Sequence, residues 1–128
     1  MNLDHAQITV APEDVDATLA FYETVIGLRR IPKSNSRTGG WFEIGEHQLH
    51  VGAEKTTNRE LNLASKRHVC FRVDDLDDAE RKLRGAGVEI IADTDPAPGW
   101  RRFYVRDPGG NRVEIGARVR ARVRADSA

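Results

Sequence analysis

The chain repeats one pattern of elements twice, and this repeat constrains its fold more than any other feature. A strand pattern, a helix pattern and three further strand patterns occur between residues 5 and 53 and again between 67 and 117. Apolar residues at every second position are typical of a strand with one buried face, and apolar spacings of three or four are typical of a helix. Each half is therefore predicted as βαβββ. A repeat of this size needs a partner unit to bury its sheet, so neither half is expected to stand alone.

The predicted elements can be placed from their apolar spacing and turn residues. In the first half, strands are predicted at 5–10, 28–33, 41–45 and 47–53, with a helix over 13–28 that ends near Gly27. In the second half, strands are predicted at 67–73, 88–93, 101–107 and 111–117, with a helix over 76–87 and its N-cap at Asp75. The polar segment 55–66 is expected to connect them. The prediction is an α+β fold with one domain at 1–116, made of modules 1–56 and 66–116.

Composition limits the classes of function. The 128 residues include 20 Lys and Arg and 20 Asp and Glu, and this zero net charge argues against a nucleic-acid-binding protein. A single cysteine excludes an internal disulfide framework and a metal site built from several cysteines. The sequence has no apolar run of about 18 residues and no visible secretory signal, so no membrane partner is expected and the expected location is cytoplasmic.

A basic tail is predicted at 117–128. Four arginines alternate in it, and in an extended chain they would share one face: Arg118, Arg120, Arg122 and Arg124. A solvated chain end is the main interpretation. Contact with an anionic ligand or a neighbouring subunit is the alternative.

Four ligand-type side chains fall on the strand faces that point away from the predicted helices. They are His5, His50, His68 and Glu114. Each has the opposite parity from the apolar residues of its own strand. His5 and His68 are 63 positions apart and His50 and Glu114 are 64 apart, so the repeat maps one pair onto the other. The fourth histidine, His47, lies at a turn with the parity opposite to that of His50, and we expect it to be an ordinary surface residue.

Imidazole nitrogens and a carboxylate oxygen suit divalent first-row metals. A catalytic site also leaves a position open for water or substrate. Two pseudo-symmetric sheets that face each other can bring such side chains together. A polar residue on a solvated strand face is the alternative for each of them. The pattern predicts a divalent metal site, and Ni, Zn, Mn, Co and Fe all suit this set of ligands.

Other side chains share the predicted metal face. Glu43 is the candidate general base, because a base should lie near the proton that a metal activates, and an exposed strand glutamate is the alternative. Arg102 and Tyr104 are candidates to orient an anionic or enolate-like oxygen of a substrate, or else to pair across strands. Trp41 and Trp100 are the candidates for an apolar wall, with core or rim packing as their alternative.

Several segments resemble the vicinal oxygen chelate superfamily, which includes glyoxalase I, extradiol dioxygenases, epimerases, fosfomycin-resistance enzymes and bleomycin-resistance proteins. These segments are LDHAQITV, FYETVIGL, HVCFRVDDLDDAERKLRGAGVEI and FYVRDPGGNRVEI. They cover residues 3–116. The resemblance implies the glyoxalase/dioxygenase-like fold, in which the paired βαβββ sheets form a cup around a metal. It also implies the same four ligand positions, and a homodimer in which the halves of a site sometimes come from different chains.

The sequence departs from each subgroup of this superfamily. Glyoxalase I usually has a carboxylate at the position of His50. Extradiol dioxygenases are matched by His5, His68 and Glu114, but His50 would be an extra ligand. The segment PAPGWRR replaces the serine-rich loop expected of the fosfomycin type, and a complete ligand set argues against a bleomycin-type binder.

The resemblance and the ligand pattern together predict a metal-dependent, glyoxalase-like enzyme. Its substrate would be a small molecule with vicinal oxygens, and it would act by lyase, isomerase or epimerase chemistry through a metal-stabilised oxyanion. Glu114 would serve as both ligand and catalytic group. The alternatives are an extradiol-type dioxygenase and a non-enzymatic antibiotic- or metabolite-binding resistance protein.

Overall fold

The computed structural model describes residues 1–119 and contains two four-stranded sheets, one from each half of the repeat. The first module consists of β1 (His5–Val10), η1 (Pro12–Asp14), α1 (Val15–Ala20), η2 (Phe21–Ile26), β2 (Arg29–Ile31), β3 (Gly39–Ile44) and β4 (His47–Ala53). The second consists of β5 (His68–Arg72), α3 (Leu76–Gly85), β6 (Ile91–Ala92), β7 (Trp100–Arg106) and β8 (Arg112–Arg118). Between them lies α2 (Arg59–Ala64).

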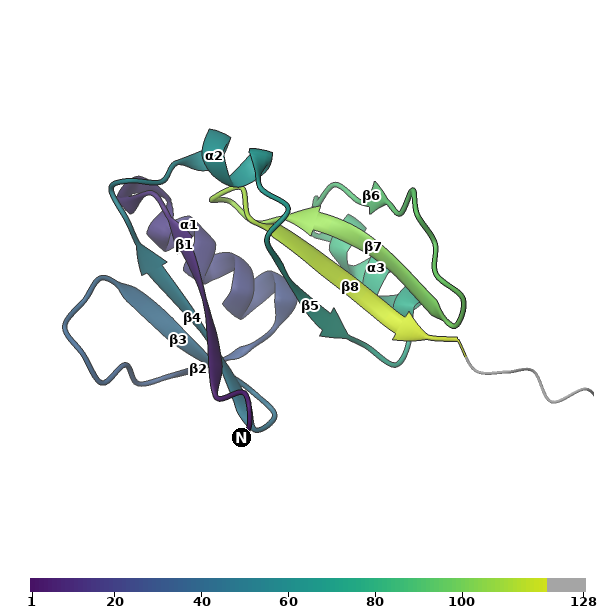
Figure 1. The fold of residues 1–128 in the computed structure, drawn as a ribbon, viewed down its shortest axis with the longest axis horizontal. Coiled ribbons are helices and arrows are strands. Elements are labelled where there is room, and N and C mark those ends of the chain that lie inside the picture. The colour runs from purple at the N-terminus through teal and green to yellow at the C-terminus, as the bar shows by residue number, and fades with distance from the viewer. Residues whose placement is uncertain (120–128) are drawn as a thin grey trace, which may run out of the picture.

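The two sheets have the same topology, which confirms the predicted βαβββ repeat. Their strand orders are β1-β4-β3-β2 and β5-β8-β7-β6. The pairs β1–β4 and β5–β8 are parallel, and all other neighbours are antiparallel. Figure 1 shows the modules side by side, with α1 behind the first sheet and α3 behind the second. One face of each sheet is therefore covered by its own helix, and the other face carries the predicted site residues.

The structure differs from the predicted elements at four places. The connector contains α2, whose N-cap Asn58 accepts a hydrogen bond from the backbone N–H of Leu61. The first helix is divided into 3₁₀, α and π segments, and β6 spans only two residues of the predicted strand 88–93. Finally, β8 continues through Arg118, two residues into the predicted tail, whose remaining three arginines lie outside the described residues.

The predicted helix boundaries have local physical causes. Asp75 caps α3, because its side-chain Oδ1 accepts a hydrogen bond from the backbone N–H of Asp78 at 3.0 Å. Gly27 ends η2 with a φ of 86°, a left-handed conformation that glycine adopts without steric cost. Within residues 1–119, no helix is both long and apolar enough to span a membrane.

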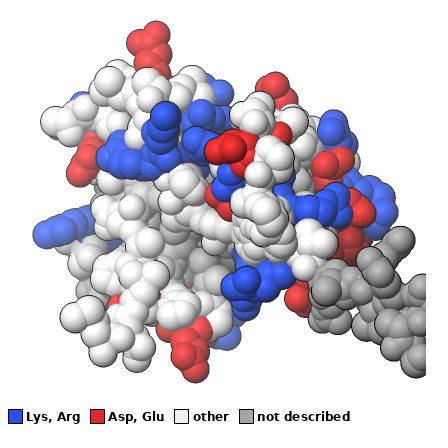
Figure 2. All heavy atoms as spheres, turned by 45° about the vertical axis from the view of Figure 1, so that its right-hand side comes forward, with Lys and Arg blue, Asp and Glu red and all other residues white. Residues whose placement is uncertain are grey.

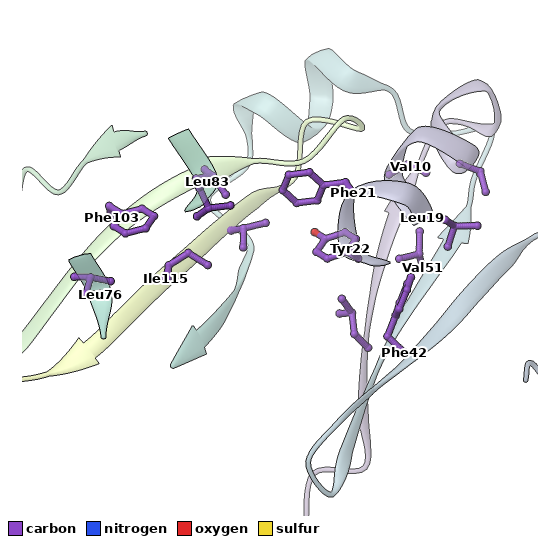
Figure 3. Packing of buried hydrophobic residues seen from close by; sticks show 14 of the residues in the cluster. Val10, Leu19, Phe21, Tyr22, Phe42, Val51, Leu76, Leu83, Phe103 and Ile115 are labelled. Carbon is purple, nitrogen blue, oxygen red and sulfur yellow. The ribbon is translucent and has the colours of Figure 1, made fainter. Parts of the chain in front are cut away.

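A single apolar core joins the two modules. Phe21 and Tyr22 of η2 belong to the first module but lie between the apolar side chains of both (Figure 3). Phe42 of β3 packs near Tyr22 on one side, with ring centroids 6.1 Å apart. Phe71 of β5 lies on the other side, at 6.4 Å. The helical segment of the first module therefore buries part of the second sheet. This agrees with the expectation that each half needs a partner unit to bury its sheet.

One buried hydrogen bond crosses this junction. The Tyr22 hydroxyl donates to Asp107 Oδ2 at 2.8 Å, and both residues are almost fully buried. Asp107 Oδ1 accepts from the backbone N–H of Asn111 at 2.8 Å. Burial raises the pKa of both Tyr22 and Asp107, while the hydrogen bond from Tyr22 lowers that of Asp107. These hydrogen-bond donors offset the cost of burying the Asp107 carboxyl group in the core.

The turn between β7 and β8 is clamped at the same junction. Asn62 of α2 donates to the carbonyl oxygens of Thr9, at 3.0 Å, and Gly109, at 2.8 Å, so one amide joins both modules. Gly109 also lies directly against β1, because a Cβ atom at this position would be only 2.2 Å from Val10 Cγ1. The DPGG turn is therefore a structural connection between the modules as well as a sequence motif.

We expect Tyr22→Phe to lower the free energy of unfolding by about 1–3 kcal/mol at pH 7, the cost of leaving a buried acceptor without its donor. Urea unfolding measures this loss. Thr24→Val is the control, because the Thr24 hydroxyl bonds only the carbonyl oxygen of Ala20 on an exposed turn.

The destabilisation caused by Tyr22→Phe should depend on pH. Without the tyrosine hydroxyl, the pKa of Asp107 rises further above its unfolded value. A carboxyl group with a raised folded pKa destabilises the fold when ionised and ceases to do so when protonated. The difference between wild type and variant should therefore shrink as the pH falls from 7 towards about 4. An equal loss at both pH values would contradict this account.

Candidate metal centre

The first pair of predicted ligands, His5 and His50, lies on the open face of the first sheet. Their rings stack with centroids 4.1 Å apart and an angle of 15° between planes. Trp41 stacks on the other side of His50, also at 4.1 Å and nearly parallel. The register explains this arrangement, because Trp41 is directly opposite His50 in the antiparallel pair β3–β4. Three rings thus form a continuous stack that holds His50, which is only 6% exposed.

Hydrogen bonds direct the ring nitrogens of this pair. His5 Nδ1 bonds the Asp4 carboxylate at 2.8 Å, which leaves Nε2 free. His50 Nε2 lies 2.8 Å from the amide oxygen Oε1 of Gln48, an acceptor only, so Nε2 carries the proton and Nδ1 is free. Burial and the neighbouring His5 lower the pKa of His50. A neutral ring with one nitrogen fixed by an outer partner is typical of histidine ligands to metals.

The second pair, His68 and Glu114, lies on the open face of the other sheet. His68 Nδ1 is 2.9 Å from the carbonyl oxygen of Lys66, so Nδ1 carries the proton. His68 Nε2 then presents a lone pair to Glu114 Oε1, only 3.2 Å away. In neutral His68 both atoms are acceptors with no hydrogen between them. A divalent cation or a second proton on the ring satisfies such a pair, and these nitrogen and oxygen donors fit a first-row metal.

Several side chains hold the Glu114 carboxylate in place. Trp100 Nε1 donates to Oε2 at 3.0 Å, and Cys70 Sγ lies 3.4 Å from the same oxygen. Trp100 reaches Glu114 across Gly116, where a Cβ atom would be only 2.1 Å from the indole ring. Desolvation and the bond to Glu114 raise the pKa of the Cys70 thiol to about 12. Cys70 is therefore a hydrogen-bond donor here rather than a thiolate nucleophile.

Arg102 and Tyr104 share this face of the second sheet. Tyr104 is directly opposite Glu114 in the pair β7–β8 and is buried. The Arg102 guanidinium already has partners, since Nε lies 3.0 Å from Asp93 Oδ2 and an Nη atom donates to the carbonyl oxygen of Asp95 at 2.9 Å. Arg102 therefore ties β7 to the loop after β6, and its charge is largely balanced.

Glu43 lies on the same face as His50 but is exposed. It pairs with Gln48 in the register and receives a hydrogen bond from Arg29 at 3.1 Å. Glu43 is exposed in the single chain, whereas a general base is usually buried. His47, predicted to be an ordinary surface residue, is exposed and bonds only the carbonyl oxygen of Leu3.

The four predicted ligands form two separate pairs, one on each module. Across residues 1–119, no three His, Cys, Asp or Glu side chains lie close enough to hold a metal ion together. Sequence reasoning missed two supporting contacts. The contact of Gln48 with His50 could have been inferred from their shared strand face. Trp100, predicted as part of an apolar wall, shares the face of Glu114 by alternation, but the hydrogen bond between them could not be inferred, because the register places Trp100 opposite Arg118.

A hollow of about 420 Å³ adjoins the histidine pair of the first module. Its lining includes both histidines, the Trp41 ring, and two cationic residues of the loop before β3, Lys33 and Arg37. This volume suits a small molecule, and its lining combines the Trp41 ring with several polar and charged side chains.

The sequence was compared with families and with known proteins. The model of the Glyoxalase/Bleomycin resistance protein/Dioxygenase superfamily matches residues 2–115. Protein PA2024 of Pseudomonas aeruginosa is 34% identical over 111 residues, which cover 80% of this chain and 79% of that protein. The virulence protein STM3117 of Salmonella typhimurium is 27% identical over 121 residues, covering 88% of this chain and 81% of the other.

Solved structures show the same fold. A glyoxalase family protein from Bacillus anthracis is 34% identical, with a TM-score of 0.83, and covers 93% of this chain and 96% of its own. Three others share the fold at lower identity. They are lactoylglutathione lyase of Agrobacterium tumefaciens (22%, TM-score 0.69, covering 91% and 92%), FosX of Listeria monocytogenes, a fosfomycin resistance protein (20%, 0.75, 92% and 92%), and the antibiotic-binding protein TnmS3 of Streptomyces (15%, 0.68, 93% and 97%). The chain belongs to the glyoxalase/bleomycin resistance protein/dioxygenase superfamily.

Proposed function

We propose that two copies of this chain assemble divalent metal sites, each from His5 and His50 of one copy and His68 and Glu114 of the other. The observation that carries this proposal is the His68–Glu114 pair, in which Nε2 and Oε1 lie 3.2 Å apart while the other ring nitrogen is bonded to a carbonyl, so that a cation or a second ring proton is needed between them. The separation of the two pairs supports assembly from two copies. Within residues 1–119 of one chain, the two pairs are not close enough to hold a metal ion together.

The set of three imidazoles and one carboxylate fits Ni, Zn, Mn, Co or Fe. When bound, such a metal supplies Lewis-acid stabilisation of a substrate oxyanion. The protein's own groups have separate roles in this proposal. Trp41 orders the histidine pair and forms an apolar wall, and Tyr104 and Arg102 orient a substrate oxygen. Glu43 accepts or returns a substrate proton once the second copy covers it.

The proposed activity is that of a lyase, isomerase or epimerase acting on a small molecule with vicinal oxygens. These reactions share a proton transfer next to a stabilised oxyanion, which needs one base and one oxyanion site. A dioxygenase would use the same His5, His68 and Glu114, so oxygen uptake with catechols after anaerobic Fe(II) loading would favour that alternative.

A non-enzymatic binding protein is the second candidate, because the hollow beside Trp41 is large enough for a small molecule. A thermal-shift screen separates the two. Stabilisation by divalent ions favours the metalloenzyme, whereas stabilisation by aromatic antibiotics alone favours the binding protein.

We expect His68→Ala to abolish stoichiometric metal binding. Losing a metal ligand should lower the metal affinity more than losing an outer-shell partner does, which typically costs roughly 10–100-fold. Metal content after dialysis and isothermal titration measure this. His47→Ala is the matched control and should retain full binding. A wild-type protein that binds no divalent ion would refute the proposal.

Mixed dimers test whether the site is shared. The His5→Ala,His50→Ala chain keeps an intact His68–Glu114 pair, and the His68→Ala chain keeps an intact first pair. If sites are shared, neither homodimer binds metal, but a co-expressed heterodimer regains one of its two sites. Two differently tagged chains, purified in tandem, allow its metal content to be measured. No recovery in the heterodimer would show that each site lies within one chain.

We expect Glu43→Gln to lower turnover by about 100-fold, within the range for removing a general base, with metal content unchanged. The assay uses a substrate found by screening a panel that includes S-lactoylglutathione and fosfomycin. Glu46→Gln, which changes an exposed glutamate at the neighbouring turn, is the control. Full turnover by Glu43→Gln would remove Glu43 from the mechanism.

A further inference from the structure

Arginines gather on the open face of the second sheet, the face that carries His68 and Glu114. By strand alternation this face holds Arg72, Arg102, Arg106, Arg112 and, at the end of β8, Arg118. Glu114 is the only carboxylate in the same rows. Figure 2 shows Lys and Arg side chains across the middle and right of the molecule, where the second module lies, with acidic side chains among them. The zero net charge of the whole chain conceals this local excess of positive charge.

Three of these arginines, Arg102, Arg106 and Arg112, differ in how their charge is balanced. Arg102 is paired with Asp93, as described above. Arg106 donates to the carbonyl oxygen of Gly110 at 3.2 Å, which does not neutralise its charge. For Arg112, no carboxylate among residues 1–119 lies within ion-pair distance. Arg112 is therefore a half-buried cation that forms no ion pair with the described residues.

The position of Arg112 is well defined. Its guanidinium carbon lies 3.8 Å from the centroid of the buried Tyr104 ring, which is a cation–π contact. Its cross-strand neighbours are His68 and Arg106. Burial, and after it the charge of Arg112, lowers the pKa of Arg106. Like charges placed opposite each other in a sheet destabilise it unless an anion balances them.

A hollow of about 170 Å³ adjoins this cation, between β1 and β5. Its lining includes Arg112, Arg67 and His68, with Gln7 and Asn111 as neutral polar side chains and no carboxylate. Arg67 hydrogen-bonds the Ser65 hydroxyl, which leaves its charge unbalanced. The hollow therefore combines two cations with neutral polar groups, beside one of the proposed metal ligands.

We propose that Arg112 and Arg67 bind an anionic oxygen group, a carboxylate or a phosphate or phosphonate, in the hollow between β1 and β5. A stacked guanidinium presents its N–H donors in a plane that matches such oxygens. This inference rests on the proposed function in one respect, since it assigns the group to the substrate of the site containing His68. The substrate is then an anion whose charged end lies on Arg112.

The test measures anion binding without metal, on the full chain freed of metal by a chelating resin. The ¹H–¹⁵N spectrum is recorded during titration with inorganic phosphate and, separately, with acetate, and sodium chloride at equal ionic strength serves as the blank. We expect saturable shifts at residues of β1, β5 and β8. In Arg112→Gln, Kd should rise about 10-fold, the effect of losing a charge-assisted hydrogen bond. The tighter of the two anions identifies the chemical class.

Arg81→Gln is the matched control, because Arg81 lies on the exposed side of α3 and pairs with Asp78. It should bind both anions as the wild type does. Arg67→Gln should also weaken binding, and it replaces Arg112→Gln if that variant loses the dispersed spectrum of a folded protein. Unchanged Kd values in the arginine variants, or no saturable shift in the wild type, would overturn the proposal. Because no metal is present, failure of the metal proposal would leave this result unaffected, and the reverse also holds.

Discussion

The hydrogen bond from Tyr22 to Asp107 fixes how the two halves of this protein sit against each other. Tyr22 comes from the helical segment of the first module and Asp107 from the last turn of the second. Both lie in the apolar core, where an unpaired hydroxyl or carboxylate is costly, so the core tolerates only an arrangement in which they meet. The contacts of Asn62 and the close approach of Gly109 to Val10 add to this constraint. The open faces of the two sheets take their orientation from this junction.

In the two candidate ligand pairs, hydrogen bonds determine which nitrogen of each histidine ring carries the proton. Asp4, Gln48 and the Lys66 carbonyl each engage one ring nitrogen of a histidine and leave the other nitrogen as a lone pair. Glu114 is held by Trp100 through the space that Gly116 leaves open. The arginines on the same face differ in their partners. Arg102 contacts Asp93 and the carbonyl oxygen of Asp95, while Arg112 has no carboxylate of residues 1–119 at ion-pair distance.

Much of the fold could be predicted from residue spacing. Strand alternation and the offset between the halves predicted both βαβββ modules, and the Asp75 cap and the Gly27 stop were placed correctly, because these features depend on local backbone geometry. The α2 helix was missed, since its six residues carry little apolar periodicity and it is stabilised by the Asn58 cap and by Asn62 at the junction. The length of β6 was overestimated, because the apolar run VEII resembles a full strand. Of these four residues only Ile91 pairs with β7, and Ala92 is the other residue of β6.

Alternation along the strands was enough to identify the face on which the candidate ligands lie, because side chains in a strand point to opposite sides by covalent geometry. It could not show that His5 and His50 form one pair and His68 and Glu114 another, since the distance between modules depends on packing across the Tyr22–Asp107 junction. The same holds for charge. Strand alternation places five arginines on one face, but only the folded chain shows that Asp93 pairs with Arg102 and that Arg112 lies over Tyr104 with no carboxylate of residues 1–119 at ion-pair distance. Long side chains reach partners that strand register does not specify, so such contacts exist only once the loops and sheets have packed.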